Sequence, residues 1–140
     1  MKNSFIVLLV AIALSSSASC QLKVTEAAKK AFATMFPNAT NLKWEKESAD
    51  EYEGNFKLNG INVSANFKHD GTWVETETTI KTTELPAAVT NSINTKYPGA
   101  VYTRAEKIEK PGGKILYEAV IKINGKTKEM EINPDGSFAE

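Results

Sequence analysis

The sequence is poor in the side chains on which catalysis and metal binding most often depend. Its 140 residues include one cysteine, Cys20, and one histidine, His69. A single cysteine excludes an intramolecular disulfide and a zinc site built from thiolates. A lone histidine beside Asp70, in an expected turn, provides neither a Ser–His–Asp nor a Cys–His arrangement. We therefore predict no catalytic residue, no metal site, no cofactor and no enzymatic activity.

An excess of charge of either sign is also missing. The chain has 17 lysine and arginine residues and 17 aspartate and glutamate residues. Proteins that bind nucleic acids carry a clustered basic excess, and strong attraction to an anionic membrane surface needs a net charge as well. We expect no nucleic-acid partner and no strong attraction to anionic membranes.

Long hydrophobic runs are absent as well. Lys2 precedes an apolar run of ten residues at 5–14, and small residues follow at 15–19. A membrane span needs about 20 apolar residues, whereas a charged start, a short apolar run and a small-residue region are typical of a secretory signal peptide. We predict a signal peptide at 1–20, no transmembrane segment, and a periplasmic or secreted protein.

Cys20 determines whether the exported protein is free or anchored. The segment 17–20 resembles a bacterial lipobox, a motif in which the cysteine is acylated. Ser17 stands where that motif usually has leucine, so we expect ordinary cleavage near Ser19 or Cys20. The alternative is an outer-membrane-anchored lipoprotein with Cys20 as its lipidation site.

Residues 21–140 form a single expected domain in which one unit occurs twice. Repeat one spans 24–80 and repeat two spans 83–140. Self-similarity of this kind constrains the architecture more than local propensity does. The matching pairs are Phe36-Pro37 with Tyr97-Pro98, Asn59-Gly60 with Asn124-Gly125, and Asp70-Gly71 with Asp135-Gly136.

Each repeat begins with an amphipathic pattern and continues with strands. Apolar residues recur at helical spacing over 24–36 and 85–97, and a proline follows each stripe. Asn59-Gly60 is a strong hairpin signal that sets Leu58 opposite Ile61. We predict an α+β fold: a tandem repeat of helix plus four antiparallel strands, forming one eight-stranded sheet with helices on one face. The expected strands are 40–47, 51–58, 61–68, 72–80, 101–109, 114–123, 126–133 and 136–140.

One strand conflicts with strict alternation. The turn after Phe67 sets Trp73 opposite it, and Glu75 and Glu77 would then share the face of Trp73. Either the strand outruns the helix or a bulge shifts the pattern, and we expect Trp73 on the core side. Glutamate pairs at strand spacing are interpreted as a solvated sheet face. These pairs are Glu45 with Glu47, Glu51 with Glu53, and Glu75 with Glu77.

The sheet face away from the helices is the remaining candidate site. Such a face can dock a protein, and a free edge strand can pair with a peptide. A competing hypothesis is a small-molecule or glycan ligand that stacks on Trp44 or Tyr102. The candidate partner-binding residues are Asn55, Lys57, Asn62, Ser64, Asn66, Lys122, Thr127 and Glu129.

Several motifs together resemble the PepSY-like, β-lactamase-inhibitor-like proteins. They are Ala31-Phe32 leading to Phe36-Pro37, then Trp44, Tyr52, Asn59-Gly60, Asp70-Gly71-Thr72-Trp73, and Leu85-Pro86-Ala87-Ala88-Val89 followed by Tyr97-Pro98. The resemblance implies two tandem α/β repeats, export to the bacterial envelope, and a non-enzymatic role as an inhibitor or ligand-binding protein. Characterised inhibitors of this fold bind an enzyme with the exposed sheet face. They contain disulfides, which this chain lacks, and none of their contact residues can be matched to a position here.

Overall fold

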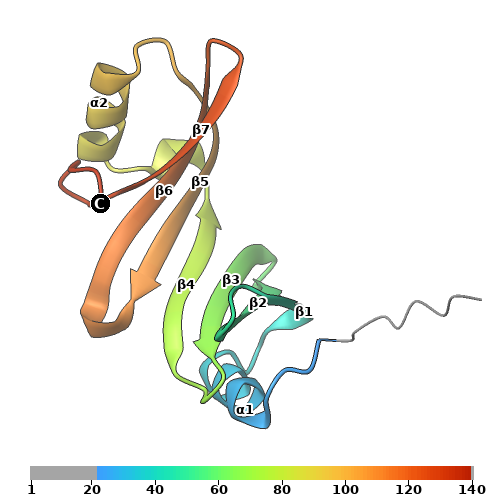
Figure 1. Ribbon diagram of the computed structural model, residues 1–140. Coiled ribbons are helices and arrows are strands. Elements are labelled where there is room, and N and C mark those ends of the chain that lie inside the picture. Colours follow the sequence, from blue (N-terminus) through green and yellow to red (C-terminus); the bar gives the residue numbers. More distant parts are fainter. Residues whose placement is uncertain (1–21, 140) are drawn as a thin grey trace, which may run out of the picture.

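The computed structural model describes residues 22–139, which form one antiparallel sheet and two helices (Figure 1). The predicted signal peptide and Cys20 lie outside these residues. Short 3-10 turns occupy Thr82–Glu84 and Pro111–Gly113. The elements are α1 (Glu26–Met35), β1 (Thr40–Lys46), β2 (Glu51–Leu58), β3 (Ile61–Lys68), β4 (Trp73–Ile80), α2 (Ala87–Lys96), β5 (Val101–Lys110), β6 (Lys114–Ile123) and β7 (Lys126–Ile132).

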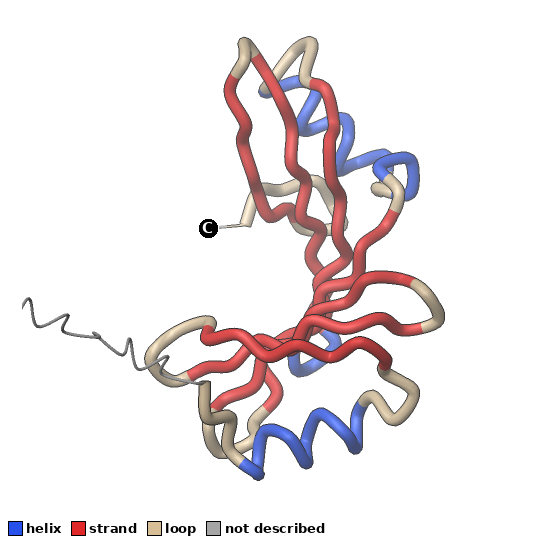
Figure 2. Tube along the Cα trace, turned by 90° about the vertical axis from the view of Figure 1, so that its right-hand side faces the viewer, coloured by secondary structure: helices blue, strands red, loops and turns tan. Residues whose placement is uncertain are grey.

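The strands follow one another across the sheet in the order in which they occur in the chain, β1 to β7. Every neighbouring pair is antiparallel. Strand β4 pairs with β3 on one side and β5 on the other, so it joins the two halves of the chain into one sheet. Figure 2 shows that the strands of the two halves run in clearly different directions, because the sheet is strongly twisted and bent.

The predicted eight-stranded sheet is wrong, because the described part of the chain forms seven strands in one sheet. Of the predicted strand 136–140, the described residues 136–139 do not form a strand. After the turn at Gly136, the backbone makes an isolated bridge between Ile132 and Phe138 and one hydrogen bond from Ala139 N to Glu131 O. The equivalent strand β4 is held by partners on both edges, whereas this segment has a partner on one side only. The arrangement is therefore four strands and three strands, not a repeat of two four-stranded units.

Helix α1 begins and ends where the sequence predicts. The Thr25 hydroxyl accepts a hydrogen bond from Ala28 N at 3.3 Å and caps the first turn. Its apolar stripe turns inward, so that Ala28 and Phe32 are buried. Phe36 leaves the helical conformation, as expected for a residue before proline. Helix α2 repeats the ending, with Tyr97 N bonded to Ile93 O at 2.7 Å.

The first-half hairpin has the predicted register. Leu58 pairs with Ile61, and Asn59 and Gly60 have φ values of 51° and 83°, as the tight turn requires. Tyr52 lies opposite Phe67 on the same face. The second-half hairpin carries a lysine toward its apolar face, and Lys128 Nζ lies 5.5 Å from the centre of the Tyr97 ring. The charge therefore lies near an aromatic ring on this face.

Each half has its own hydrophobic core. Phe32 packs edge-on against Phe56, with ring centres 4.9 Å apart, in the core between α1 and strands β2 and β3. Val89 and Ile93 of α2 pack against β5, β6 and β7 in the second core. Strand register places the sheet residues of both cores on one face, as predicted, and Figure 2 shows the two helices on the outer side of the bent sheet. The opposite face is left uncovered by helices.

Trp73 lies on the core side, and a bulge resolves the conflict in its strand. The register of β3 with β4 shifts between Asn66 and Phe67, so that Phe67 faces Trp73 while Asn66 faces Glu75. The Trp73 indole nitrogen donates a hydrogen bond to Thr76 at 3.0 Å on the same side. The bulge thus turns Trp73 inward and Glu75 outward.

Candidate functional site

The uncovered sheet face forms an open groove of about 1210 Å³. Residues from all seven strands contribute to its lining, because the bend of the sheet brings the two halves toward each other on this face. Eight glutamates and three basic residues (Lys43, Lys57 and Arg104) line it. The groove is therefore acidic although the whole chain has equal numbers of acidic and basic residues. The eight are Glu47, Glu53, Glu75, Glu77, Glu106, Glu118, Glu129 and Glu131.

Six of the eight predicted partner-binding residues lie in this groove. Lys122 and Thr127 do not, because they pair with each other near the far end of the β6–β7 hairpin. The six that line the groove are Asn55, Lys57, Asn62, Ser64, Asn66 and Glu129.

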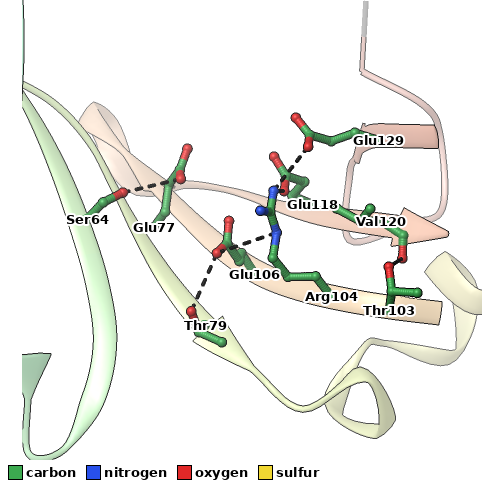
Figure 3. A network of polar contacts seen from close by, with 9 residues as sticks. All are labelled: Ser64, Glu77, Thr79, Thr103, Arg104, Glu106, Glu118, Val120 and Glu129. Atoms are coloured by element: carbon green, nitrogen blue, oxygen red, sulfur yellow. Dashed lines mark hydrogen bonds and ion pairs between the residues drawn. The ribbon is translucent and has the colours of Figure 1, made fainter. Parts of the chain in front are cut away.

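Strand pairing gathers the carboxylates at the centre of the groove. Glu106 on β5 lies directly opposite Glu118 on β6, and Thr79 on β4 lies opposite Glu106. Ser64 on β3 lies opposite Glu77. Residues opposite each other in an antiparallel ladder share a face and have close side chains. Figure 3 shows these side chains rising from four strands into the same space.

Arg104 neutralises one side of the acidic centre. Its guanidinium lies 2.6 Å from Glu118, 3.0 Å from Glu129 and 3.9 Å from Glu106 (Figure 3). The hydrogen bond to Glu118 and the neighbouring negative charges raise the pKa of Arg104. Burial nevertheless raises the pKa of Glu118, since desolvation and the repulsion from Glu129 and Glu106 outweigh the attraction of the arginine.

Lys110 neutralises the other side. Its ammonium lies 2.9 Å from Glu75 and 3.8 Å from Glu131, so it links β4 to β7 across β5 and β6. The hydrogen bond to Glu75 raises the pKa of Lys110. The two basic side chains thus each hold carboxylates from different strands together.

Glu77 lies between these two ion-pair networks and belongs to neither. Within residues 22–139 no basic side chain comes within 4 Å of its carboxylate, and Ser64 Oγ donates a hydrogen bond to it at 3.3 Å. Desolvation, followed by repulsion from Glu106, Glu75 and Glu118, raises the pKa of Glu77 from 4.5 to about 7. The interpretation of Glu75 and Glu77 as a solvated face is therefore wrong, because Glu77 is desolvated and the Glu75 side chain is 16% exposed and paired with Lys110.

An apolar floor explains this desolvation. Ile108 lies opposite Glu77 in the register and Leu116 lies opposite Ile108, so all three share the groove face. Ile108 and Leu116 are fully buried, and Val120 on the same strand face is 8% exposed. None of them belongs to the two helix-covered cores. The carboxylates therefore stand on a hydrophobic base that reduces their contact with water.

A buried amide at the groove also has an unused hydrogen-bonding atom. Asn66 is 7% exposed, and its amide nitrogen donates to Glu75 at 3.3 Å. Its Oδ1 atom is buried without a hydrogen-bond partner among the described residues. A buried acceptor of this kind is costly unless a donor reaches it.

The aromatic residues of the glycan hypothesis are engaged elsewhere. Trp44 packs against the first-half core, on the helix side of the sheet. Tyr102 packs against the second-half core, and its hydroxyl donates to Thr90 O at 3.3 Å and to Asn94 at 2.9 Å. Neither ring lines the groove.

Comparison with known proteins identifies the family of this chain. The family model described as β-lactamase-inhibitor-like and PepSY-like matches residues 50–140, which is more than half of the chain. The chain belongs to this family. No curated protein sequence matches the chain. The resemblance predicted from the sequence motifs is thereby confirmed.

Solved structures with the PepSY-like fold superpose on nearly the whole described chain. A Bacteroides eggerthii protein, described as periplasmic, has a TM-score of 0.76 at 20% identity and covers 85% of this chain and 88% of its own. A DUF2874 family protein from Bacteroides uniformis has a TM-score of 0.75 at 19% identity, covering 84% and 88%. A BLIP-like protein from Bacteroides fragilis has a TM-score of 0.69 at 23% identity, covering 85% of both chains. At these identities the likeness establishes the fold.

Two further observations bear on the early predictions. Neither helix of the described PepSY-like chain is long and apolar enough to span a membrane. Within residues 22–139, no group of three or more histidine, cysteine, aspartate or glutamate side chains is arranged to hold a metal ion.

Proposed function

We propose that this PepSY-like protein is a non-catalytic, exported protein of the bacterial envelope that binds a protein or peptide partner in its concave groove, and that this binding can inhibit the partner. The observation that carries the proposal is the groove itself. The helices cover one face of the sheet, while the other is bent, polar and open over about 1210 Å³. A concave face of this size accommodates a protruding loop or segment better than it does a small molecule.

Export to the periplasm is part of this proposal. The N-terminal pattern at 1–20 predicts it, and the Bacteroides eggerthii protein with the same fold is described as periplasmic. We propose release after ordinary cleavage, with acylation of Cys20 as the alternative.

A steric block of the groove tests the docking site. Asn62 is exposed and lines the groove, whereas Asn91 is exposed on α2. We expect Asn62→Trp to reduce the recovery of partners from an envelope extract, because the indole occupies the space that the partner needs. Asn91→Trp is the matched control and should leave recovery unchanged. Equal recovery with both variants would remove the groove as the docking site.

A further inference from the structure

We propose that the groove selects a partner segment that presents an arginine or lysine side chain, and that Glu77 and Asn66 receive its cationic group. This inference rests on the proposed function, in that the groove must first be the docking site. It goes beyond that function by naming the chemistry of the partner.

The first argument is the imbalance of charge. The lining carries eight carboxylates and three basic residues, an excess of five negative charges in a chain that is neutral overall. Lys110 lies beside the lining and pairs with two of these carboxylates, Glu75 and Glu131, which reduces the excess to four negative charges. Such a concave surface attracts positive segments and repels acidic ones and nucleic acid.

The second argument is the pattern already present in the groove. Arg104 links carboxylates of three strands, and Lys110 links carboxylates of two. Glu77, between them, has the same kind of surroundings but no cation within 4 Å in the described chain. A third basic group from a partner would complete the series. The apolar floor beneath strengthens the pair, because attraction between charges grows as water is excluded.

The third argument is the unused acceptor of Asn66. On β3, Asn66 and Ser64 are two residues apart on the groove face and lie opposite Glu75 and Glu77. Asn66 Oδ1 is buried and has no hydrogen-bond partner in the described part of the chain, and the carboxylate of Glu77 receives one hydrogen bond from Ser64. A guanidinium has five N–H donors in a planar fork, so one arginine can serve the carboxylate and a neighbouring carbonyl together.

Binding of a cation must then be linked to pH. The groups that surround Glu77 are Ser64 from β3, Glu75 from β4, Arg104, Glu106 and Lys110 from β5, Glu118 from β6, and Glu129 and Glu131 from β7. In the free protein, desolvation and then repulsion from the neighbouring carboxylates raise the pKa of Glu77 to about 7. A bound cation favours the ionised form, so the carboxyl group releases a proton on binding below that pH. Affinity should therefore rise with pH through 7 and level off above it.

The test compares a peptide with its neutral isostere. The labelled mature protein is titrated by NMR, at low ionic strength, with an acetylated and amidated hexapeptide of alternating alanine and arginine. The control peptide has citrulline at each arginine position. At pH 8 we expect binding of the arginine peptide to be about tenfold tighter or more, the value of a charged hydrogen-bonded pair. Added salt should reduce this difference.

Two variants locate the effect. Glu77→Gln keeps the size of the side chain and removes its charge, and should weaken the arginine peptide by about tenfold while removing the pH dependence through 7. Glu109→Gln makes the same change of net charge on the helix side of β5, where Glu109 pairs with Lys107, and should change affinity little. The assignment of Glu77 would be overturned if the affinity for the arginine peptide did not change with pH through 7. It would also be overturned if Glu77→Gln and Glu109→Gln lost the same amount of affinity.

The outcomes separate this inference from the proposed function. If the arginine and citrulline peptides bind equally, including failure of both to bind at millimolar concentration, cation selection is wrong. Loss of envelope partners in Asn62→Trp would in that case still support docking in the groove. If Asn62→Trp keeps its partners, the docking site itself is wrong, whatever the peptides do.

Discussion

Replacing Glu77 by glutamine should stabilise the free protein at alkaline pH, although it weakens binding. The ionised carboxylate is destabilised in the fold by its apolar floor and by Glu75, Glu106 and Glu118. Glutamine has nearly the same shape and can still accept the hydrogen bond from Ser64. The substitution therefore removes the repulsion without leaving a cavity.

The size of the effect follows from the pKa of Glu77. A rise from 4.5 to about 7 corresponds to an upper limit of about 3.4 kcal/mol, since each pKa unit is worth about 1.4 kcal/mol. Glu77 is only half-buried, so solvent screening reduces this, and we expect about 1–2 kcal/mol.

The sign of the pH dependence is fixed by linkage. The folded protein holds its proton on Glu77 up to about pH 7, whereas the unfolded chain loses it near 4.5. Between these values the folded state binds more protons, so the contribution of Glu77 to stability falls as pH rises and stays low above 7. Below 4.5 wild type and Glu77→Gln should be equally stable.

Urea unfolding followed by circular dichroism at pH 4 and pH 8 measures this difference. The control is Glu109→Gln, which removes an exposed charge paired with Lys107 on the other sheet face and should change stability by less than about 0.5 kcal/mol. The reasoning is refuted if Glu77→Gln gains no stability at pH 8, or if its gain is as large at pH 4.

Four other substitutions test the fold and the export. Gly136→Ala should destabilise by about 2 kcal/mol or more, because Gly136 has a φ of +88° and a Cβ there would lie 2.6 Å from Ala88 O. Gly60 has a similar φ of +83° but open space around it, so Gly60→Ala should lower the free energy of unfolding by only about 1 kcal/mol. Equal losses of stability for the two variants in thermal unfolding would contradict the role of the close approach between Gly136 and Ala88 O. Phe67→Ala should cost about 3–5 kcal/mol in urea unfolding, since Phe67 is fully buried between Phe32 and Trp44, and a loss below about 1 kcal/mol would contradict its place in the core. Cys20→Ala should leave the protein in the soluble periplasmic fraction, as in wild type, and a shift from membranes to that fraction would instead establish the lipid anchor.

Local signals were sufficient for most of the fold. The stripe ending at Phe36 and the Asn59-Gly60 turn depend on residues close in the sequence, so the helix and the hairpin register could be predicted. The absence of the eighth strand could not be predicted. Strand β4 has a partner strand on each side, whereas the segment at 136–140 has a partner on one side only, and no local sequence pattern indicates this difference. The sequence left two explanations for the alternation around Trp73, a strand that outruns the helix or a bulge. The structure contains the bulge, and Asn66 pairs with Glu75 as a result.

The acidic centre was missed because it depends on several strand pairings at once. Glu77, Glu106 and Glu118 are far apart in the sequence and meet only when β4, β5 and β6 are in register. One signal was available. The run from Ile115 to Ile121 is apolar at successive positions except Glu118, which indicates a strand buried on both faces and a desolvated carboxylate within it.

Site-specific photocrosslinking in the living envelope tests the account most directly. A benzoylphenylalanine residue is introduced at Asn62, in the groove, and in a separate strain at Asn91, on the outer face of α2. The account predicts a crosslinked partner from position 62, none from position 91, and loss of the position 62 product when Glu77 is also changed to glutamine. A partner captured from position 91 and not from position 62 would contradict docking in the groove.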